Sequence, residues 1–239
     1  GDHVFGLPGL VGTMDLLGRT AELHIHGPLQ VGDFIDFLLK TFYTDIGYKL
    51  IFHPVDVHQH TLVYEDRSIT VYSIPLQHRL PTCGYLFKEK PGLPHIRREM
   101  IDAFNIPVSQ INNIKAGASW TTEDGTIIPH ERLTTPAKPP RSYAYCSDTV
   151  YLPELKDILH GVTLLYHEAT YMHERALRAE QTRHTTALQA ATLARDAKVE
   201  QLCVGHFSAS LKDENALLHE AQSVFPNTIL ANEGLVVSI

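Results

Sequence analysis

The sequence predicts an α/β fold, because strand-like runs alternate with amphipathic helical runs along its 239 residues. β-branched and aromatic residues, which favour strands, dominate several of the short runs. Hydrophobic residues make up 44% of the chain and charged residues 20%, which suits a globular domain with a buried core.

Four predicted strands each lead to a histidine or a carboxylate. They cover 69–74 before His78, 142–146 before Asp148, 162–166 before His167 and Glu168, and 201–204 before His206. Because α/β proteins place their sites at the carboxyl ends of strands, we expect these side chains to converge at one sheet edge.

Helical periodicity of apolar residues is found in three further stretches. They cover 31–42, 187–197 and 213–225. In the second of these, Thr185 or Thr186 is able to cap the helix, since a threonine hydroxyl accepts from a free backbone N–H.

The stretch from about 88 to 138 differs from the rest because it is rich in proline and its apolar residues are sparse. A short helix over 93–104 would expose basic side chains. Between 79 and 115, six basic residues stand against three acidic ones (Arg79, Lys88, Lys90, Arg97, Arg98 and Lys115 against Glu89, Glu99 and Asp102). This excess favours a protruding arm, although composition alone fits a solvated surface loop better.

The composition also narrows the functional classes. A net charge of −7 argues against a broadly basic surface for nucleic acid, although it allows a local patch. No apolar run is long enough to span a membrane, and no secretory leader opens the chain. Three cysteines without CxxC spacing fit a reducing compartment, so we expect a cytoplasmic protein.

Several histidines and aspartates suit metal-assisted hydrolysis. Two-metal hydrolysis needs neutral imidazoles, which suit zinc, and one carboxylate that can bridge both ions. The candidates are Asp2, His3, His78, Asp148 and His206. Each one, taken alone, is more often a structural residue than a ligand. The chain opens on Gly1-Asp2-His3 without a methionine, so we expect that a preceding segment is absent.

Five short segments carry more specific motifs. They are Gly1–Leu10 (GDHVFGLPGL), Tyr145–Thr149 (YCSDT), His167–Thr170 (HEAT), His184–Thr186 (HTT) and Gly205–Ser208 (GHFS). The first segment resembles the second half of the HxHxDH motif of the RNase Z family, followed by that family's glycine-rich continuation. The other four resemble, in the same order, the family's SGDT, HEAT and His-Ser-Thr segments and the segment with its last histidine ligand. The resemblance covers essentially the whole chain.

The resemblance implies a metallo-β-lactamase αββα sandwich that lacks its first strands. Residues 1–239 would form one domain, with an arm inserted at about 88–135. It also implies the metal ligands. Asp2, His3 and His206 would hold one zinc ion, His78 would serve a second, and Asp148 would bridge them. The second ion also needs an HxH pair, which does not precede Asp2.

Other roles follow from the same resemblance. Glu168 and His184 would transfer the proton to the leaving 3′ oxygen, Asp2 would orient the attacking hydroxide, and His167 would orient its neighbours. For Glu168 and His184 the alternative is a structural pair that joins two loops, and for His167 it is plain packing. His24-Ile25-His26-Gly27 would be an ordinary strand before a Gly-Pro turn and not the missing HxH pair.

The resemblance further implies a homodimer that acts on precursor tRNA. Its arm would grip the tRNA elbow from the neighbouring subunit. Lys90, Arg97 and Arg98 on the arm, and Lys138 and Arg141 on a proline-rich loop, would contact phosphates, unless the two loop residues are merely solvated charge.

The implied reaction is zinc-dependent hydrolysis that removes the 3′ trailer from precursor tRNA. Two alternatives remain open. One is a phosphodiesterase of the same fold that acts on small substrates, which the long arm disfavours. The other is a noncatalytic tRNA-binding subunit that lacks the HxH ligands, which the retention of Asp148, Glu168 and His184 disfavours.

Overall fold

The computed structural model describes residues 3–42 and 45–239. The chain divides into two compact units, one formed by Gly1–Lys88 with Ser142–Ile239 and the other by Glu89–Arg141. The second unit contains most of the segment that the sequence predicts to be an arm, and its action as an arm stays a prediction. No helix within the described residues is long and apolar enough to cross a membrane.

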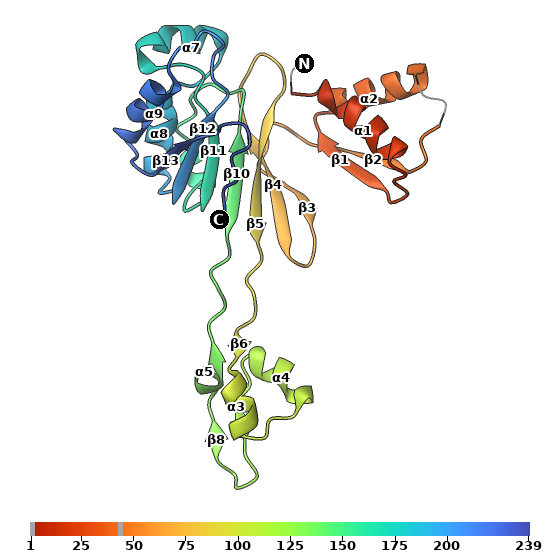
Figure 1. The fold of residues 1–239 in the computed structure, drawn as a ribbon, viewed down its shortest axis with the longest axis vertical. Helices are drawn as coiled ribbons and strands as arrows, with labels where there is room; N and C mark the ends of the chain where they lie inside the picture. Colours follow the sequence, from red (N-terminus) through yellow and green to blue (C-terminus); the bar gives the residue numbers. More distant parts are fainter. Residues whose placement is uncertain (1–2, 43–44) are drawn as a thin grey trace. The chain divides into compact units, whose positions relative to one another are not determined.

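A mixed seven-stranded sheet forms the centre of the larger unit (Figure 1). Its order is β13-β12-β11-β10-β5-β4-β3. The strands are β3 (Leu62–Glu65), β4 (Ile69–Pro75), β5 (Cys83–Glu89), β10 (Ser142–Cys146), β11 (Leu164–Glu168), β12 (Gln201–Gly205) and β13 (Thr228–Leu230). β10 to β13 run parallel, whereas β5 is antiparallel to β10 and β3 to β4.

The four strands predicted from the sequence are confirmed as β4, β10, β11 and β12. β11 begins and ends two residues later than expected, because His167 and Glu168 still pair with Val204 and Gly205 of β12. Both side chains are fully buried, so these residues belong to the sheet and do not merely follow it.

Helices pack on the parallel half of this sheet and bury its core (Figure 1). They are α6 (Leu155–Ile158), α8 (Ala187–Asp196) and α9 (Glu214–Gln222). Helix α7 (Ala176–Thr182) contacts a 3-10 turn, η1 (His173–Arg175), which in turn contacts α8. α8 buries four alanines completely, which allows its backbone to approach β11 and β12 closely. Thr186 and Gln189 form a capping box at its start. Of the two threonines that the sequence offers as the cap, the structure therefore uses Thr186.

The N-terminal part of the larger unit contains two helices and a two-stranded parallel sheet. They are α1 (Gly6–Leu16), β1 (Leu23–Gly27), α2 (Leu29–Phe42) and β2 (Leu50–Pro54). The prediction that the HIHG segment is a strand before a Gly-Pro turn is confirmed by β1. Tyr48 is buried, and its hydroxyl donates to the carbonyl of Val11 at 2.9 Å, which joins α1 to the segment that leads into β2.

The second unit has a hydrophobic cluster of its own. Its elements are β6 (His95–Ile96), α3 (Arg98–Ala103), α4 (Val108–Lys115), β7 (Trp120–Thr121), β8 (Ile127–Ile128), α5 (His130–Leu133) and β9 (Thr134–Thr135). Ile106, Ile114, Ile128 and Leu133 are almost fully buried together. The interpretation of this stretch as a solvated loop is therefore wrong.

The helix predicted over 93–104 is correct only in its second half. His95 and Ile96 form β6, which pairs with β9, and helix α3 begins at Arg98. Pro94 disfavours helical angles in the residue before it, and Arg97 keeps an extended backbone with ψ of 122°.

Candidate metal centre

Three sharp turns bring the candidate residues to the carboxyl edge of the parallel strands. Asp148, which follows β10, and His206, which follows β12, have φ angles of 53° and 60°. Arg183, directly before His184, has a φ of 62°. Left-handed backbone costs a residue with a Cβ about 1–2 kcal/mol. Such strain persists where the surroundings enforce it, which is typical of functional sites.

The Asp148 carboxylate lies between two imidazoles. Its Oδ1 is 3.2 Å from Nε2 of His206, and its Oδ2 is 3.1 Å from Nε2 of His3. The rings of His3 and His206 are stacked, with their centroids 5.3 Å apart. Each oxygen of one carboxylate therefore faces a different histidine nitrogen, which is an arrangement suited to shared metal ligation.

His78, which follows β4, lies beside this group through His184. Its ring lies 5.1 Å from the ring of His184, which in turn lies 5.3 Å from that of His206. The Nε2 atom of His78 is buried and has no hydrogen-bond partner among the described residues. Burial lowers the pKa of His78, although the Asp148 charge opposes this. The ring is therefore biased towards its neutral form, which can ligate a metal.

The residues present fit a divalent metal ion. A buried nitrogen without a partner costs about 1–3 kcal/mol, and a bound cation would remove that cost at His78. Donor atoms of Asp148, Glu168, His184 and His206 lie within 4.8 Å of one another. Imidazole and carboxylate donors suit zinc as well as manganese and iron. Asp2, predicted to be both a ligand and a catalytic residue, lies outside the described residues.

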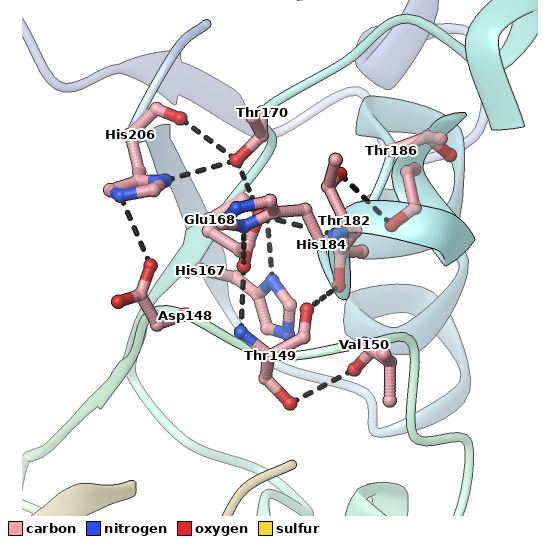
Figure 2. A network of polar contacts seen from close by, with 12 residues as sticks. Asp148, Thr149, Val150, His167, Glu168, Thr170, Thr182, His184, Thr186 and His206 are labelled. Carbon is pink, nitrogen blue, oxygen red and sulfur yellow. Dashed lines mark hydrogen bonds and ion pairs between the residues drawn. The ribbon is translucent and has the colours of Figure 1, made fainter. Parts of the chain in front are cut away.

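Glu168 stands near these donors but is not free to bind a metal. Its side chain is fully buried, and its oxygens accept from the backbone N–H of Thr149 at 2.7 Å and of Thr185 at 3.1 Å. The hydroxyl of Thr170 donates at 2.5 Å, and Nδ1 of His184 lies 3.0 Å away (Figure 2). Four donors saturate the carboxylate, which leaves no lone pair for an ion.

His184 is held by this carboxylate. Burial disfavours the charged form of Glu168, but hydrogen bonds from His184 and Thr170 outweigh it and lower the pKa of Glu168. The hydrogen bond to Glu168 raises the pKa of His184, against the effect of burial. The structure thus brings the two residues of the predicted proton-transfer pair together, with the imidazole beside Asp148 and His206.

Comparison with known proteins identifies the family. The chain is 53% identical over 239 residues to a ribonuclease Z of Bacteroides fragilis. This match spans all of the chain and 79% of that protein. It is 48% identical over the same length to a ribonuclease Z of Porphyromonas gingivalis, with 79% of that protein covered. The chain belongs to the ribonuclease Z family. Its members are metal-dependent endoribonucleases, and the chain is accordingly a hydrolase.

Solved structures support the same fold. Human tRNase Z, short form, matches with a TM-score of 0.66 at 20% identity, over all of this chain and 75% of that one. A metallo-β-lactamase fold protein from Bacillus subtilis matches with a TM-score of 0.61 at 17% identity, over 99% and 73%. The predicted metallo-β-lactamase fold is confirmed. No family model matches the chain.

Thr170, the last residue of the HEAT segment, is a member of this ribonuclease Z site that the sequence did not single out. Its one hydroxyl proton goes to Glu168 Oε2, the shorter and charged contact, at 2.5 Å. Nδ1 of His206 lies 3.0 Å from Oγ1 of Thr170, and because that hydroxyl proton is already used, Nδ1 must be the donor of this contact. The proton on Nδ1 leaves Nε2 of His206 with the lone pair that faces Asp148. Thr170 therefore links Glu168 to His206 (Figure 2).

Replacing Thr170 with valine is expected to weaken zinc binding and to lower nuclease activity about tenfold, because groups that orient metal ligands contribute on that scale. Zinc affinity would be measured by competition with a chromogenic chelator. Thr170→Ser retains the hydroxyl and should restore both properties. Equal zinc affinities of the valine and serine variants would rule out the assignment.

His167 does not join the metal group. Its ring is fully buried, Nδ1 donates to the carbonyl of Glu168 at 2.8 Å, and Nε2 has no partner among the described residues. Burial lowers the pKa of His167. These contacts fix the end of β11, and the predicted orienting role stays a prediction.

The predicted phosphate-binding residues have varied surroundings. Lys138 is exposed, and Arg98 lies 3.8 Å from Asp102 on the surface of α3. Nε of Arg97 donates to the carbonyl of Thr134 at 3.1 Å, so part of this guanidinium serves the second unit itself.

Arg141 pairs with Glu89 where the chain enters and leaves the second unit. Nε of Arg141 donates to Glu89 Oε2 at 3.0 Å, its backbone N–H donates at 2.9 Å, and its terminal nitrogen contacts Oε1. These hydrogen bonds lower the pKa of Glu89 to about 2. The pair thus joins the two chain segments, and phosphate binding by Arg141 stays a prediction.

Proposed function

We propose that this ribonuclease Z family member removes the 3′ trailer from precursor tRNA by hydrolysis that depends on two zinc ions. The observation that carries the proposal is the saturated Glu168–His184 pair beside Asp148, because it supplies a proton donor next to a metal-binding carboxylate. The structural similarity to human tRNase Z supports tRNA as the substrate class.

The proposed ligands are His3 and His206 for one ion and His78 for the other, with Asp148 shared between them. Asp2 is proposed as a further ligand from the sequence motif alone. When bound, the ions supply a nucleophile at neutral pH and neutralise charge on the phosphate. Asp148 is suited to the shared position because it lies within 3.2 Å of His3 and His206 of one proposed ion, while its charge also acts on His78 of the other.

His184 is proposed as the general acid. A ribose 3′ oxygen is a poor leaving group, so it needs a proton as its bond to phosphorus breaks. Glu168 holds Nδ1 of His184 at 3.0 Å, which orients the ring and favours its protonated form. Thr149, Thr170 and Thr185 hold Glu168 in turn, so the carboxylate keeps its position while the proton leaves His184.

The second unit is proposed to grip the tRNA. Lys90, Arg97 and Arg98 belong to this unit and would contact backbone phosphates, which position an RNA without reading its sequence. Lys138 and Arg141 are proposed to contribute near its boundary. We propose a homodimer in which the unit of one subunit grips the tRNA bound by the other. The unpaired cysteines favour a cytoplasmic location.

The proposed function can be tested by replacing His184 with glutamine and comparing two substrates, of which only one has a leaving group that needs a proton. Cleavage of a precursor tRNA with a 3′ trailer is expected to fall about 100-fold, since general acids contribute on that scale. Hydrolysis of bis(p-nitrophenyl) phosphate should change little, because p-nitrophenolate leaves without a proton. Trailer release would be followed on gels and nitrophenolate by absorbance.

The exposed His160→Gln is the matched control and should retain both activities. Equal losses on both substrates would refute His184 as the acid. Wild-type hydrolysis of the small diester without trailer release would instead favour a phosphodiesterase for small substrates. Absence of both activities in the zinc-loaded protein would favour a noncatalytic tRNA-binding subunit.

A further inference from the structure

Three histidines gather on one face of the two-stranded sheet formed by β1 and β2. His26 and His53 are register partners across the parallel pair, and His24 stands two residues before His26 on the same strand. Alternate residues of a strand share a face, so all three imidazoles lie on the same side. None of them belongs to the candidate metal centre.

The His53 ring contacts the rings of both other histidines. Nδ1 of His24 lies 2.8 Å from Nε2 of His53. The His24 and His53 rings have centroids 5.1 Å apart and an interplanar angle of 14°. The His26 ring lies 4.4 Å from that of His53, with an angle of 11°. Two nitrogens that bind one tetrahedral zinc ion at about 2.0–2.1 Å lie roughly 3.3 Å apart, so His24 and His53 need to separate only slightly.

The carboxylate of Glu22 lies near Nε2 of His24, the ring nitrogen that does not face His53. Oε2 of Glu22 lies 3.6 Å from Nε2 of His24, and Oε1 of Glu22 lies 3.4 Å from Nζ of Lys49. At 3.6 Å the Glu22 contact is a surface ion pair, and it places a negative charge beside the histidines, which favours a bound cation.

We propose that His24, His26 and His53 bind one divalent transition-metal ion of the class that prefers imidazole, such as zinc. His24 contributes Nδ1 and His53 contributes Nε2. His26 supplies the third ligand after its stacked ring turns about its side-chain torsions, and water takes the fourth position. The side chain of His24 is 47% exposed, so an ion can reach the site from solvent.

Zinc titration of the metal-stripped protein tests this site. Isothermal titration calorimetry with zinc alone is expected to show about one ion fewer per chain in His53→Gln and in His24→Gln than in the wild type. His160→Gln, which removes an exposed histidine elsewhere, should bind as many ions as the wild type. Equal counts for the wild type and both site variants would overturn the proposal.

A second measurement on the wild-type protein does not depend on the folding of any variant. Diethyl pyrocarbonate modifies accessible imidazoles, and mass spectrometry locates the modified residues. Zinc is expected to slow the modification of His24, His26 and His53 at least severalfold, while His160 should react at the same rate with and without zinc. Unchanged rates at all three would likewise overturn the site. Both readouts are independent of trailer cleavage.

Discussion

Replacing Asp148 with asparagine is expected to remove bound zinc and to lower precursor tRNA cleavage by about a thousandfold or more. The carboxylate faces His3 and His206 with separate oxygens, so neutralising it weakens every ion that it helps to hold. Metal ions contribute several kcal/mol to transition-state stabilisation, and each 1.4 kcal/mol is about tenfold in rate. Zinc content by mass spectrometry and trailer release by gel would measure the two losses.

Asparagine is a more specific test than alanine because it tolerates the left-handed backbone of this position. Alanine at a φ of 53° would add backbone strain to the loss of the carboxylate. Asp148→Ala should nevertheless lose metal and activity together. Asp157→Ala, on the exposed surface of α6, is the matched control and should behave as the wild type. An Asp148→Asn protein that retains its zinc would show that the carboxylate is not a shared ligand.

The sequence predicted the centre of this site because its residues follow strands. Asp148, His206 and His78 come just after β10, β12 and β4, and ends of sheet strands meet at a common edge. His184 does not follow a strand. Its contact with Glu168 depends on the turn at Arg183, whose left-handed φ no local pattern indicates. Only the resemblance to a known family predicted that pairing.

Two features escaped prediction for physical reasons. The role of Thr170 depends on hydrogen bonds to Glu168 and His206, and His206 lies 36 residues further along the chain. No periodicity reports such a contact. The histidine cluster depends on His53, whose position opposite His26 follows from strand register and not from sequence spacing. The hydrophobic cluster of the second unit was missed because its few apolar residues are scattered over short elements.

Replacing the whole second unit with a two-residue turn is expected to lower kcat/KM for precursor tRNA by about a thousandfold. Lys88 and Ser142 are register partners in the antiparallel β5–β10 pair, so Asn-Gly is able to join them as a hairpin. A deletion limited to 91–115 would remove Ile106 and Ile114 and leave Ile128 and Leu133 without their packing partners. Replacement of the whole unit removes the entire hydrophobic cluster.

The expected loss follows from the phosphate contacts proposed for Lys90, Arg97 and Arg98. Three charge-assisted contacts at about 1.5 kcal/mol each amount to roughly a thousandfold. Hydrolysis of bis(p-nitrophenyl) phosphate should stay within about twofold, because a small diester makes none of these contacts. Lys90→Gln with Arg98→Gln in the intact protein should reduce the salt dependence of tRNA binding. If the turn variant loses both activities equally, the second unit supports the catalytic fold and does not grip tRNA.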